Sequence, residues 1–202
     1  DGIIVIDREV APGTPAADFY ELRDDFVLEV DLTPNRIDAA SHYGVARDIA
    51  AWIDCHAGHK ALTRPSVDDF KTDSDGKAVA VEIRNPEACT RYCGLTIRGV
   101  KVAESPEWLK DRLTSIGLRP INNIVDITNY ILHAFGQPLH CFDLDKIKGE
   151  KIIVSTCPEG TPFTTLDEVE RKLNAADLMI CNEIEPMCIA GIFGGLDSGV
   201  TE

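Results

Sequence analysis

Long apolar runs are missing from this chain of 202 residues. A helix that spans a membrane needs about 20 consecutive apolar residues, and no segment approaches that length, so we expect no membrane span. The first ten residues, DGIIVIDREV, lack both an initiator methionine and a basic stretch, and we therefore expect no signal peptide. Because the sequence starts at Asp1 and stops on VTE, it has the look of a piece cut from a longer protein.

Basic residues are scarce: 20 Lys and Arg stand against 34 Asp and Glu, which gives a net charge of -14. The acidic residues crowd within 18–31 and again within 167–185. Broad, phosphate-driven binding of nucleic acid requires clustered Lys and Arg, and this balance argues against it. Contact with the end of a nucleic acid through a small patch is still allowed.

The common motifs for metals, nucleophiles and phosphates are also absent. The seven cysteines include no C-x-x-C pair and no histidine at zinc-finger spacing, so we expect buried free thiols in a reducing cytosol and no metal site. The sequence has no G-x-S-x-G, no H-E-x-x-H and no phosphate loop. His140 and Cys141 are adjacent, but neighbours on a predicted strand face opposite ways, and we expect no Cys-His nucleophilic pair.

What is present is a mixture of helix and strand patterns. At 44% hydrophobic and 27% charged residues the chain can bury a core, as one large domain or two small ones. Strands are predicted for 26–34, 78–83, 91–102, 151–156, 177–182 and 186–195, with a hairpin within 164–174. Residues 58–78 are polar and without periodicity, as in a linker or an exposed loop.

Helices are predicted where apolar residues recur every three or four positions behind a capping residue. These segments are a short helix within 12–22 with Thr14 as N-cap and Pro15 in its first position, a helix from Ser41 to Gly58, one capped by Ser105 that ends at Gly117, and one within 120–136. The strands and helices do not alternate in a regular βαβ rhythm. The predicted fold class is therefore α+β, with mixed, mostly antiparallel sheets and a few helices.

The stretch 120-PINNIVDITNYILHAFGQPLHCFD-143 combines an apolar helix with neutral polar groups. Asn122 or Asn123 can cap the helix and Gly136 ends it, and we expect its apolar stripe to hold Ile124, Ile127, Ile131 and Phe135 while Asp126, Asn129 and His133 lie on another face. A helix, a turn and a short strand can bring Asn129, Gln137 and His140 together. From the local pattern alone, the favoured reading is that these groups only satisfy loop backbone.

The glycine-rich run 191-GIFGG-195 has the same two readings. Glycines let strands pack closely, and they also leave room for a ligand. Local pattern does not separate the two.

Four segments together resemble the beta subunit of bacterial phenylalanyl-tRNA synthetase. They are 32-LTPNRIDAASHYGVARDIA-50, 86-PEACTRYCGLTI-97, 117-GLRPINNIVDITNYILHAFGQPLHCFDLDKI-147 and 190-AGIFGGLDSGVTE-202. The resemblance covers nearly the whole chain in order, and the run from Gly117 to Ile147 is long and specific. It implies three parts: the end of an N-terminal module with a helical connection (1–57), a linker or exposed loop that returns to strand (58–84), and a truncated central editing-type domain (85–202).

In that family this region carries a hydrolytic pocket that removes tyrosine wrongly attached to the phenylalanine tRNA. Carried over by motif, the catalytic residues are His140 and Arg119, and the substrate-binding residues are Asn129, Gln137, Gly191 and Gly194. The implied roles are that His140 orients the attacking water or accepts its proton, Arg119 meets the carbonyl or the terminal ribose and phosphate, and the two amides hold the amino acid. The two glycines would form the floor that admits the aromatic ring.

The resemblance also implies partners and limits. The partners would be the alpha subunit in a heterotetramer, the 3′ end of tRNA(Phe) and tyrosine as editing substrate, in the cytoplasm and without a membrane. ATP and magnesium are expected only for the full synthetase, and no cofactor in this chain. The family's acceptor for the tyrosine hydroxyl is a Glu downstream of the matched motifs; Glu202 does not occupy that position, so we expect pocket walls without the specificity carboxylate. The alternative function is a non-catalytic scaffold that supports the alpha subunit and tRNA.

Overall fold

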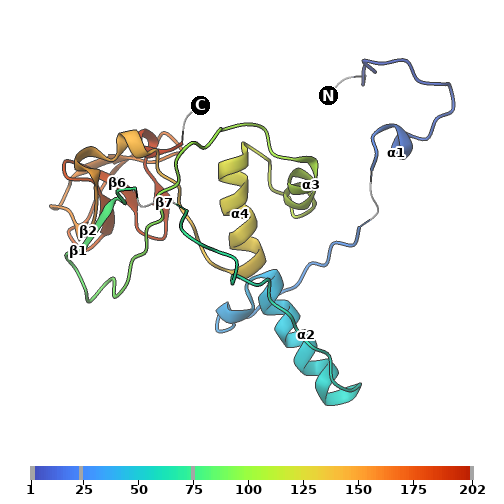
Figure 1. Cartoon of the computed structure of the whole chain (residues 1–202), viewed down its shortest axis with the longest axis horizontal. Coiled ribbons are helices and arrows are strands. Elements are labelled where there is room, and N and C mark those ends of the chain that lie inside the picture. Colours follow the sequence, from blue (N-terminus) through green and yellow to red (C-terminus); the bar gives the residue numbers. More distant parts are fainter. Residues whose placement is uncertain (1–2, 23–24, 74–75, 201–202) are drawn as a thin grey trace. The chain divides into compact units, whose positions relative to one another are not determined.

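The computed structural model describes residues 3–22, 25–73 and 76–200 (Figure 1), so Asp1 and Glu202 lie outside the described residues. The chain divides into two units, residues 1–31 and 32–202. In the first unit the described residues form one short helix, α1, Ala16–Phe19. Its N-cap residue is Pro15, and the hydroxyl of Thr14 donates to the carbonyl of Ala11 at 2.8 Å. The prediction of Thr14 as the cap is therefore wrong.

Two predicted strands are absent from the described residues because no neighbour supplies a hydrogen-bonded ladder. Within 26–34 the backbone pairs with no other strand, and the side chain of Phe26 is 94% exposed. Residues 91–102 form no backbone ladder. Their link to the segment before β1 is a hydrogen bond of 3.2 Å from the backbone N–H of Val79 to the side-chain hydroxyl of Thr96. Alternating residues thus predicted extended chain without showing whether a partner strand exists.

The short strand predicted at 139–142 is also absent from the described chain. Pro138 lacks an N–H to donate, and the turn η2, Leu144–Lys146, begins only a few residues later. The segment between them pairs with no other strand in the described chain.

The three longer helices begin and end near the predicted residues. Helix α2, His42–His56, is capped by Ser41, whose hydroxyl accepts from the N–H of Gly44 at 3.0 Å, and follows the turn η1, Ile37–Ala39. Helix α4, Asn123–Phe135, is capped by Asn122 and ends at Gly136, whose φ of 74° suits glycine. Helix α3, Glu107–Ser115, has Pro106 at its N-cap position, so the prediction of Ser105 as its cap is wrong.

Helix α4 contacts both α2 and α3 (Figure 1). Trp108 of α3 meets Tyr130 edge to face with ring centroids 5.6 Å apart, and Leu109 and Leu113 of α3 are 1% exposed. On α4 the predicted stripe needs a correction: Ile127 is 49% exposed, whereas Asp126 is completely buried. The hydroxyl of Ser105 donates to Asp126 at 2.5 Å, and the N–H of Ile121 donates to the same carboxylate at 2.9 Å.

Five strands form the larger sheet in the order β1-β2-β5-β6-β7. Strand β1 pairs with β2 in parallel and the other pairs are antiparallel, while β3 and β4 form a separate antiparallel pair. The bounds are β1 Ala80–Ile83, β2 Lys151–Thr156, β3 Pro162–Thr164, β4 Glu170–Lys172, β5 Leu178–Cys181, β6 Pro186–Ile189 and β7 Phe193–Gly194, with turns η3 Lys148–Glu150 and η4 Leu196–Ser198. The α+β class with mostly antiparallel sheets is confirmed. A hairpin is present as predicted, but it begins at Pro162, before the predicted range 164–174.

Successive residues of β2 point to opposite faces of the sheet, and each face is packed. Ile152 and Val154 belong to one buried cluster together with Ile147, Ile180, Met187 and Cys188. Ile153 belongs to the other, together with Phe163, Leu173, Met179 and Cys181. A strand buried on both faces explains why KIIVST has a nearly continuous apolar centre.

All seven cysteines are free, as predicted, but they are not all buried: Cys55 and Cys93 are exposed. Burial raises the pKa of Cys188 to about 11, which leaves its thiol protonated and inert at neutral pH. None of the helices in the described segments combines the length and the apolar character that a membrane crossing requires.

Candidate functional site

The imidazole of His140 lies directly over Gly194 of strand β7. A Cβ on residue 194 would stand 2.6 Å from Cε1 and 3.2 Å from Nε2 of His140, and 2.9 Å from Cδ1 of Leu166. Since real Cβ atoms do not approach other atoms so closely, only glycine fits under the ring without displacement. Two residues that the motifs single out, more than fifty positions apart in the sequence, are thus in contact.

The backbone around Gly194 is fixed by its neighbours. Strand β7 pairs with β6, placing Gly194 opposite Cys188, and the carbonyl of Gly194 accepts from the N–H of Leu166 at 3.0 Å. Gly195 donates its N–H to the carbonyl of Met187 at 2.8 Å, and a Cβ there would meet that same oxygen at 2.7 Å. The close packing of strands and the contact with His140 therefore both require glycine in this run.

The His140 ring is held by packing and keeps its nitrogens available. It meets Phe142 in a T-shaped arrangement with centroids 4.5 Å apart and planes at 65°. Neither ring nitrogen makes a hydrogen bond within the part of the chain that the structure describes. Much of the residue's surface is exposed, yet the ring itself is flanked by Gly194 and Phe142, and this desolvation lowers the pKa of His140 below its ordinary 6.5. A lowered pKa favours the neutral imidazole, which is the form that can accept a proton.

The other predicted polar residues stand on separate elements. Arg119 is exposed on the connection between α3 and α4, and Asn129 is half-buried on α4. Neither side chain makes a hydrogen bond or ion pair within residues 3–22, 25–73 and 76–200. Gln137 is exposed, and its amide makes only a long contact of 3.4 Å to the carbonyl of Pro138. No hydrogen bond in those ranges joins these three to His140, and their side chains are free to meet a ligand.

Gly191 differs from Gly194 in what requires it. It lies in the exposed turn between β6 and β7 with a φ of 70°, and no atom stands within 4 Å of where its Cβ would be. Backbone conformation, and not a close neighbour, explains glycine at this position.

Sequence reasoning missed Leu166 and Phe142. Leu166 follows β3 and reaches Gly194 through the isolated bridge between Thr165 and Gly195. That bridge joins two distant loops, so no local pattern points to it. Phe142 carried a usable signal, because an aromatic two positions from a histidine lies on the same side of an extended segment.

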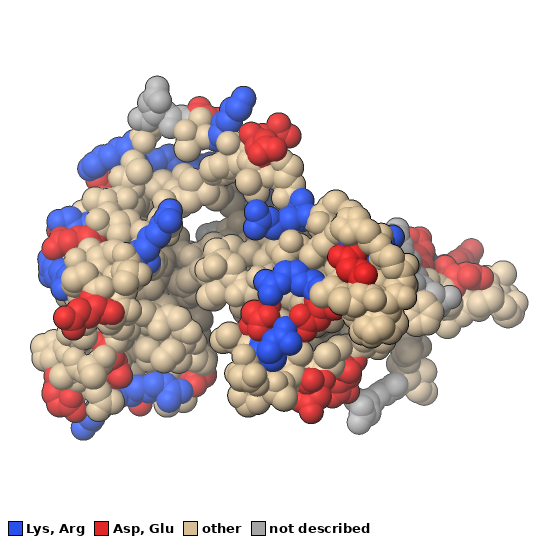
Figure 2. Space-filling view, turned by 90° about the horizontal axis from the view of Figure 1, so that it is seen from below, with Lys and Arg blue, Asp and Glu red and all other residues tan. Residues whose placement is uncertain are grey.

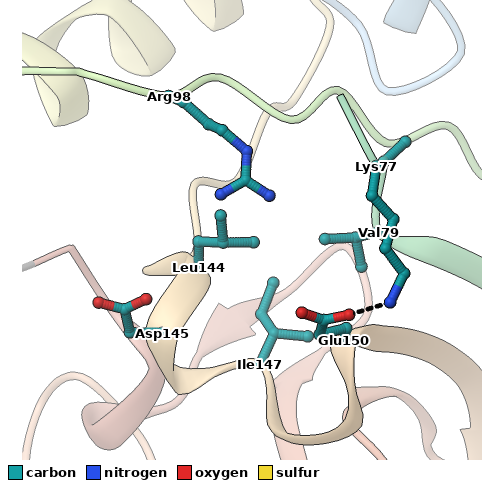
Figure 3. Close-up of a pocket in the computed structure, with 8 residues that line it drawn as sticks. Lys77, Val79, Arg98, Leu144, Asp145, Ile147 and Glu150 are labelled. Atoms are coloured by element: carbon teal, nitrogen blue, oxygen red, sulfur yellow. Dashed lines mark hydrogen bonds and ion pairs between the residues drawn. The ribbon is translucent and has the colours of Figure 1, made fainter. Parts of the chain in front are cut away.

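A separate cavity of about 230 Å³ lies elsewhere in the second unit (Figure 3), and none of the six predicted residues lines it. Within the described ranges no three or more His, Cys, Asp and Glu residues converge as a metal site would require. On the face drawn in Figure 2, the coloured basic side chains are interspersed with acidic ones and form no single basic field.

Comparison with known proteins places these motifs in a family. The model of the B3/4 domain matches residues 88–202. The phenylalanine–tRNA ligase beta subunit of Bacteroides fragilis is 63% identical over the whole chain, which covers 25% of that protein. The corresponding beta subunits of Porphyromonas gingivalis and Carboxydothermus hydrogenoformans are 57% and 46% identical, again over the whole chain and over 25% and 24% of their lengths.

The chain therefore spans about a quarter of the length of the curated relatives that it matches. The resemblance to phenylalanyl-tRNA synthetase beta subunits is confirmed. Because the matched model covers more than half of the sequence, this chain belongs to the B3/4 domain family.

Proposed function

We propose that this chain is the editing module of a phenylalanine–tRNA ligase beta subunit and hydrolyses the ester of tyrosine wrongly attached to tRNA(Phe). The observation that carries the proposal is the imidazole of His140, held over Gly194 with both ring nitrogens unbonded in the described chain. The similarity over the whole chain to ligase beta subunits supplies the substrate class.

The chemistry requires little beyond placement of one water. An aminoacyl ester is activated, so water can attack its carbonyl carbon, after which the ester C–O bond breaks and the ribose hydroxyl leaves with a proton. His140 orients that water or accepts its proton, for which a neutral imidazole is suited. No covalent nucleophile enters this scheme.

The remaining predicted residues supply binding. Arg119, which has no partner within the described residues, meets the carbonyl oxygen or the terminal ribose and phosphate. Asn129 and Gln137 hold the amine or carbonyl of the amino acid. Leu166, beside Gly194, offers an apolar surface to the aromatic ring.

Selectivity for tyrosine over phenylalanine requires a buried acceptor for the phenolic hydroxyl. We propose that residues 1–202 hold the pocket walls without that carboxylate. The partners of the full enzyme would be the alpha subunit and the 3′ end of tRNA(Phe), in the cytoplasm, with ATP and magnesium used only by the synthetic site. No cofactor takes part in the proposed hydrolysis.

Deacylation of Tyr-tRNA(Phe) by the complete ligase tests the proposal. We expect His140→Ala to slow hydrolysis by about a hundredfold, the lower range for loss of a general base, with aminoacylation unchanged. Gly194→Trp, which fills the space under the ring, should be as severe. The matched control is His133→Ala, which removes an exposed histidine at the end of α4.

A second candidate function is a non-catalytic scaffold for the alpha subunit and tRNA. It is favoured by exposed apolar side chains on α2, where Ile49 and Trp52 stand in solvent. If clearance of Tyr-tRNA(Phe) persists unchanged in a ligase that carries both His140→Ala and Gly194→Trp, the scaffold function replaces the editing function.

A further inference from the structure

The cavity of about 230 Å³ is lined by three segments of the chain and has an apolar floor. Its walls are residues 77–79, which lead into β1, Arg98 on the following segment, and the turns η2 and η3. The hydrogen bond from the N–H of Val79 to the hydroxyl of Thr96 ties the first two segments together. Ile147 belongs to a buried core cluster, against which Val79 and Leu144 pack. The apolar floor is therefore a fixed part of the core.

The charged groups around the floor are one ion pair and two solvent-exposed groups that have no protein partner in the described chain. Lys77 and Glu150 form an ion pair across one side (Figure 3). Arg98 points into the cavity toward Leu144, and its positive charge adds to that of Lys77 in lowering the pKa of Glu150. Within the described ranges, neither the guanidinium of Arg98 nor the carboxylate of Asp145 has a hydrogen-bond or ion-pair partner.

Size and charge balance limit what this cavity can accept. Two cations and two anions line it, so it has no net charge to attract a polyanion such as a nucleotide. Its volume of about 230 Å³ lies below the ~300 Å³ at which pockets for drug-sized ligands begin. The cavity suits a small molecule that carries one charge of each sign and an apolar body.

We propose that this cavity binds a free α-amino acid with an aliphatic side chain, whose carboxylate pairs with Arg98 and whose ammonium pairs with Asp145. The planar guanidinium matches a carboxylate in a bidentate manner, and the side chain lies on Val79, Leu144 and Ile147. This site shares no residue with the proposed editing pocket and does not depend on the proposed function.

Titration of the 202-residue chain with L-leucine, followed by methyl NMR of Val79, Leu144 and Ile147, tests the proposal. We expect saturable shifts at these methyls in the millimolar range. L-leucinamide lacks the carboxylate and 4-methylpentanoate lacks the ammonium, and each should bind about tenfold more weakly or worse. Inorganic phosphate is the competitor for an unspecific anion site at Arg98, and we expect that it does not displace leucine.

The matched variants are Arg98→Gln and Asp145→Asn, each of which removes one charge from a side chain that forms no hydrogen bond or ion pair in the described structure. Both variants should keep the NMR spectrum of the folded chain, and their dissociation constants for leucine should rise by about tenfold. His140→Ala should bind leucine as the unaltered chain does, which separates this cavity from the editing pocket. Absence of shifts, equal binding by Arg98→Gln, or displacement of leucine by phosphate would each overturn the proposal.

Discussion

The imidazole ring of His140 occupies the space that any side chain at Gly194 would need. Cε1 of His140 lies 2.6 Å from the site of that missing Cβ. Gly194 does not have a positive φ, so its backbone would accept another residue. What requires glycine here is the histidine, and the position of the histidine in turn depends on this glycine.

Gly194→Ala should therefore displace the imidazole and reduce Tyr-tRNA(Phe) hydrolysis by tenfold or more. The measurements are the deacylation rate and the NMR signals of the His140 ring. Gly199→Ala is the matched control, because its Cβ would meet only Leu166 at an ordinary 3.8 Å. Full activity of Gly194→Ala with unmoved ring signals would contradict the assignment.

The pH dependence should follow the lowered pKa of His140. Desolvation lowers the pKa of His140 below its ordinary 6.5, so the decline of hydrolysis with falling pH should be centred below pH 6.5. The unfolded chain takes up this proton at higher pH, so the group also lowers the free energy of unfolding as the pH falls through 6.5. NMR titration of the ring measures the pKa directly. Phe142→Ala exposes the ring and should raise its pKa toward 6.5; an unchanged value would remove the desolvation argument.

Loss of the buried bond between Ser105 and Asp126 should destabilise the helical part of the chain. Ser105→Ala leaves a completely buried carboxylate with one donor fewer, at a cost of about 1–3 kcal/mol in the free energy of unfolding. Asp126→Ala should cost more, since it also strands the N–H of Ile121. In urea denaturation the double variant should cost less than the sum of the two. Strict additivity would show that the groups do not interact.

Asn122→Ala should remove a working helix cap. Its side-chain oxygen accepts from the N–H groups of Ile124 and Val125 at 3.1 and 3.0 Å, and loss of such a cap costs about 1 kcal/mol. Asn129→Ala on the same helix is the control, because Asn129 makes no hydrogen bond within the described residues. Thermal denaturation should separate the two variants, and equal stabilities would speak against the cap.

Cys141 should react slowly with iodoacetamide although it neighbours His140. Burial raises the pKa of its thiol, which leaves little reactive thiolate at pH 8. Cys55 and Cys93 are exposed and should be alkylated first. Mass spectrometry of timed digests gives the order, and early labelling of Cys141 would refute it.

Local chemistry in the sequence predicts elements whose determinants are local. Asn122 and Gly136 bound α4 because a cap and a left-handed residue act on their own helix. The strands predicted at 26–34 and 91–102 were wrong, because a strand needs a partner strand and its own residues do not reveal one. The prediction of Ser105 as the cap of α3 was wrong, because its hydroxyl donates instead to the buried carboxylate of Asp126 on α4.

The candidate site shows the same division. Motifs pointed to His140 and Gly194, and the tertiary fold brings them into contact. The sequence did not predict Leu166, because Leu166 is brought to His140 and Gly194 by the bridge between Thr165 and Gly195. Whether Arg119, Asn129 and Gln137 act beside them stays a prediction that substrate binding must test.

The parallel pairing of β1 with β2 has a mechanical consequence for the histidine. Ile83 stands opposite Val154, so the chain leaves one strand and returns on its immediate neighbour. Everything between, including α3, α4 and His140, is a loop with both ends fastened to the same sheet. The contact of His140 with Gly194 of β7 gives this segment a third point of attachment, because β7 belongs to the same sheet. The ring is therefore positioned by the two ends of the segment and by its own packing against the sheet.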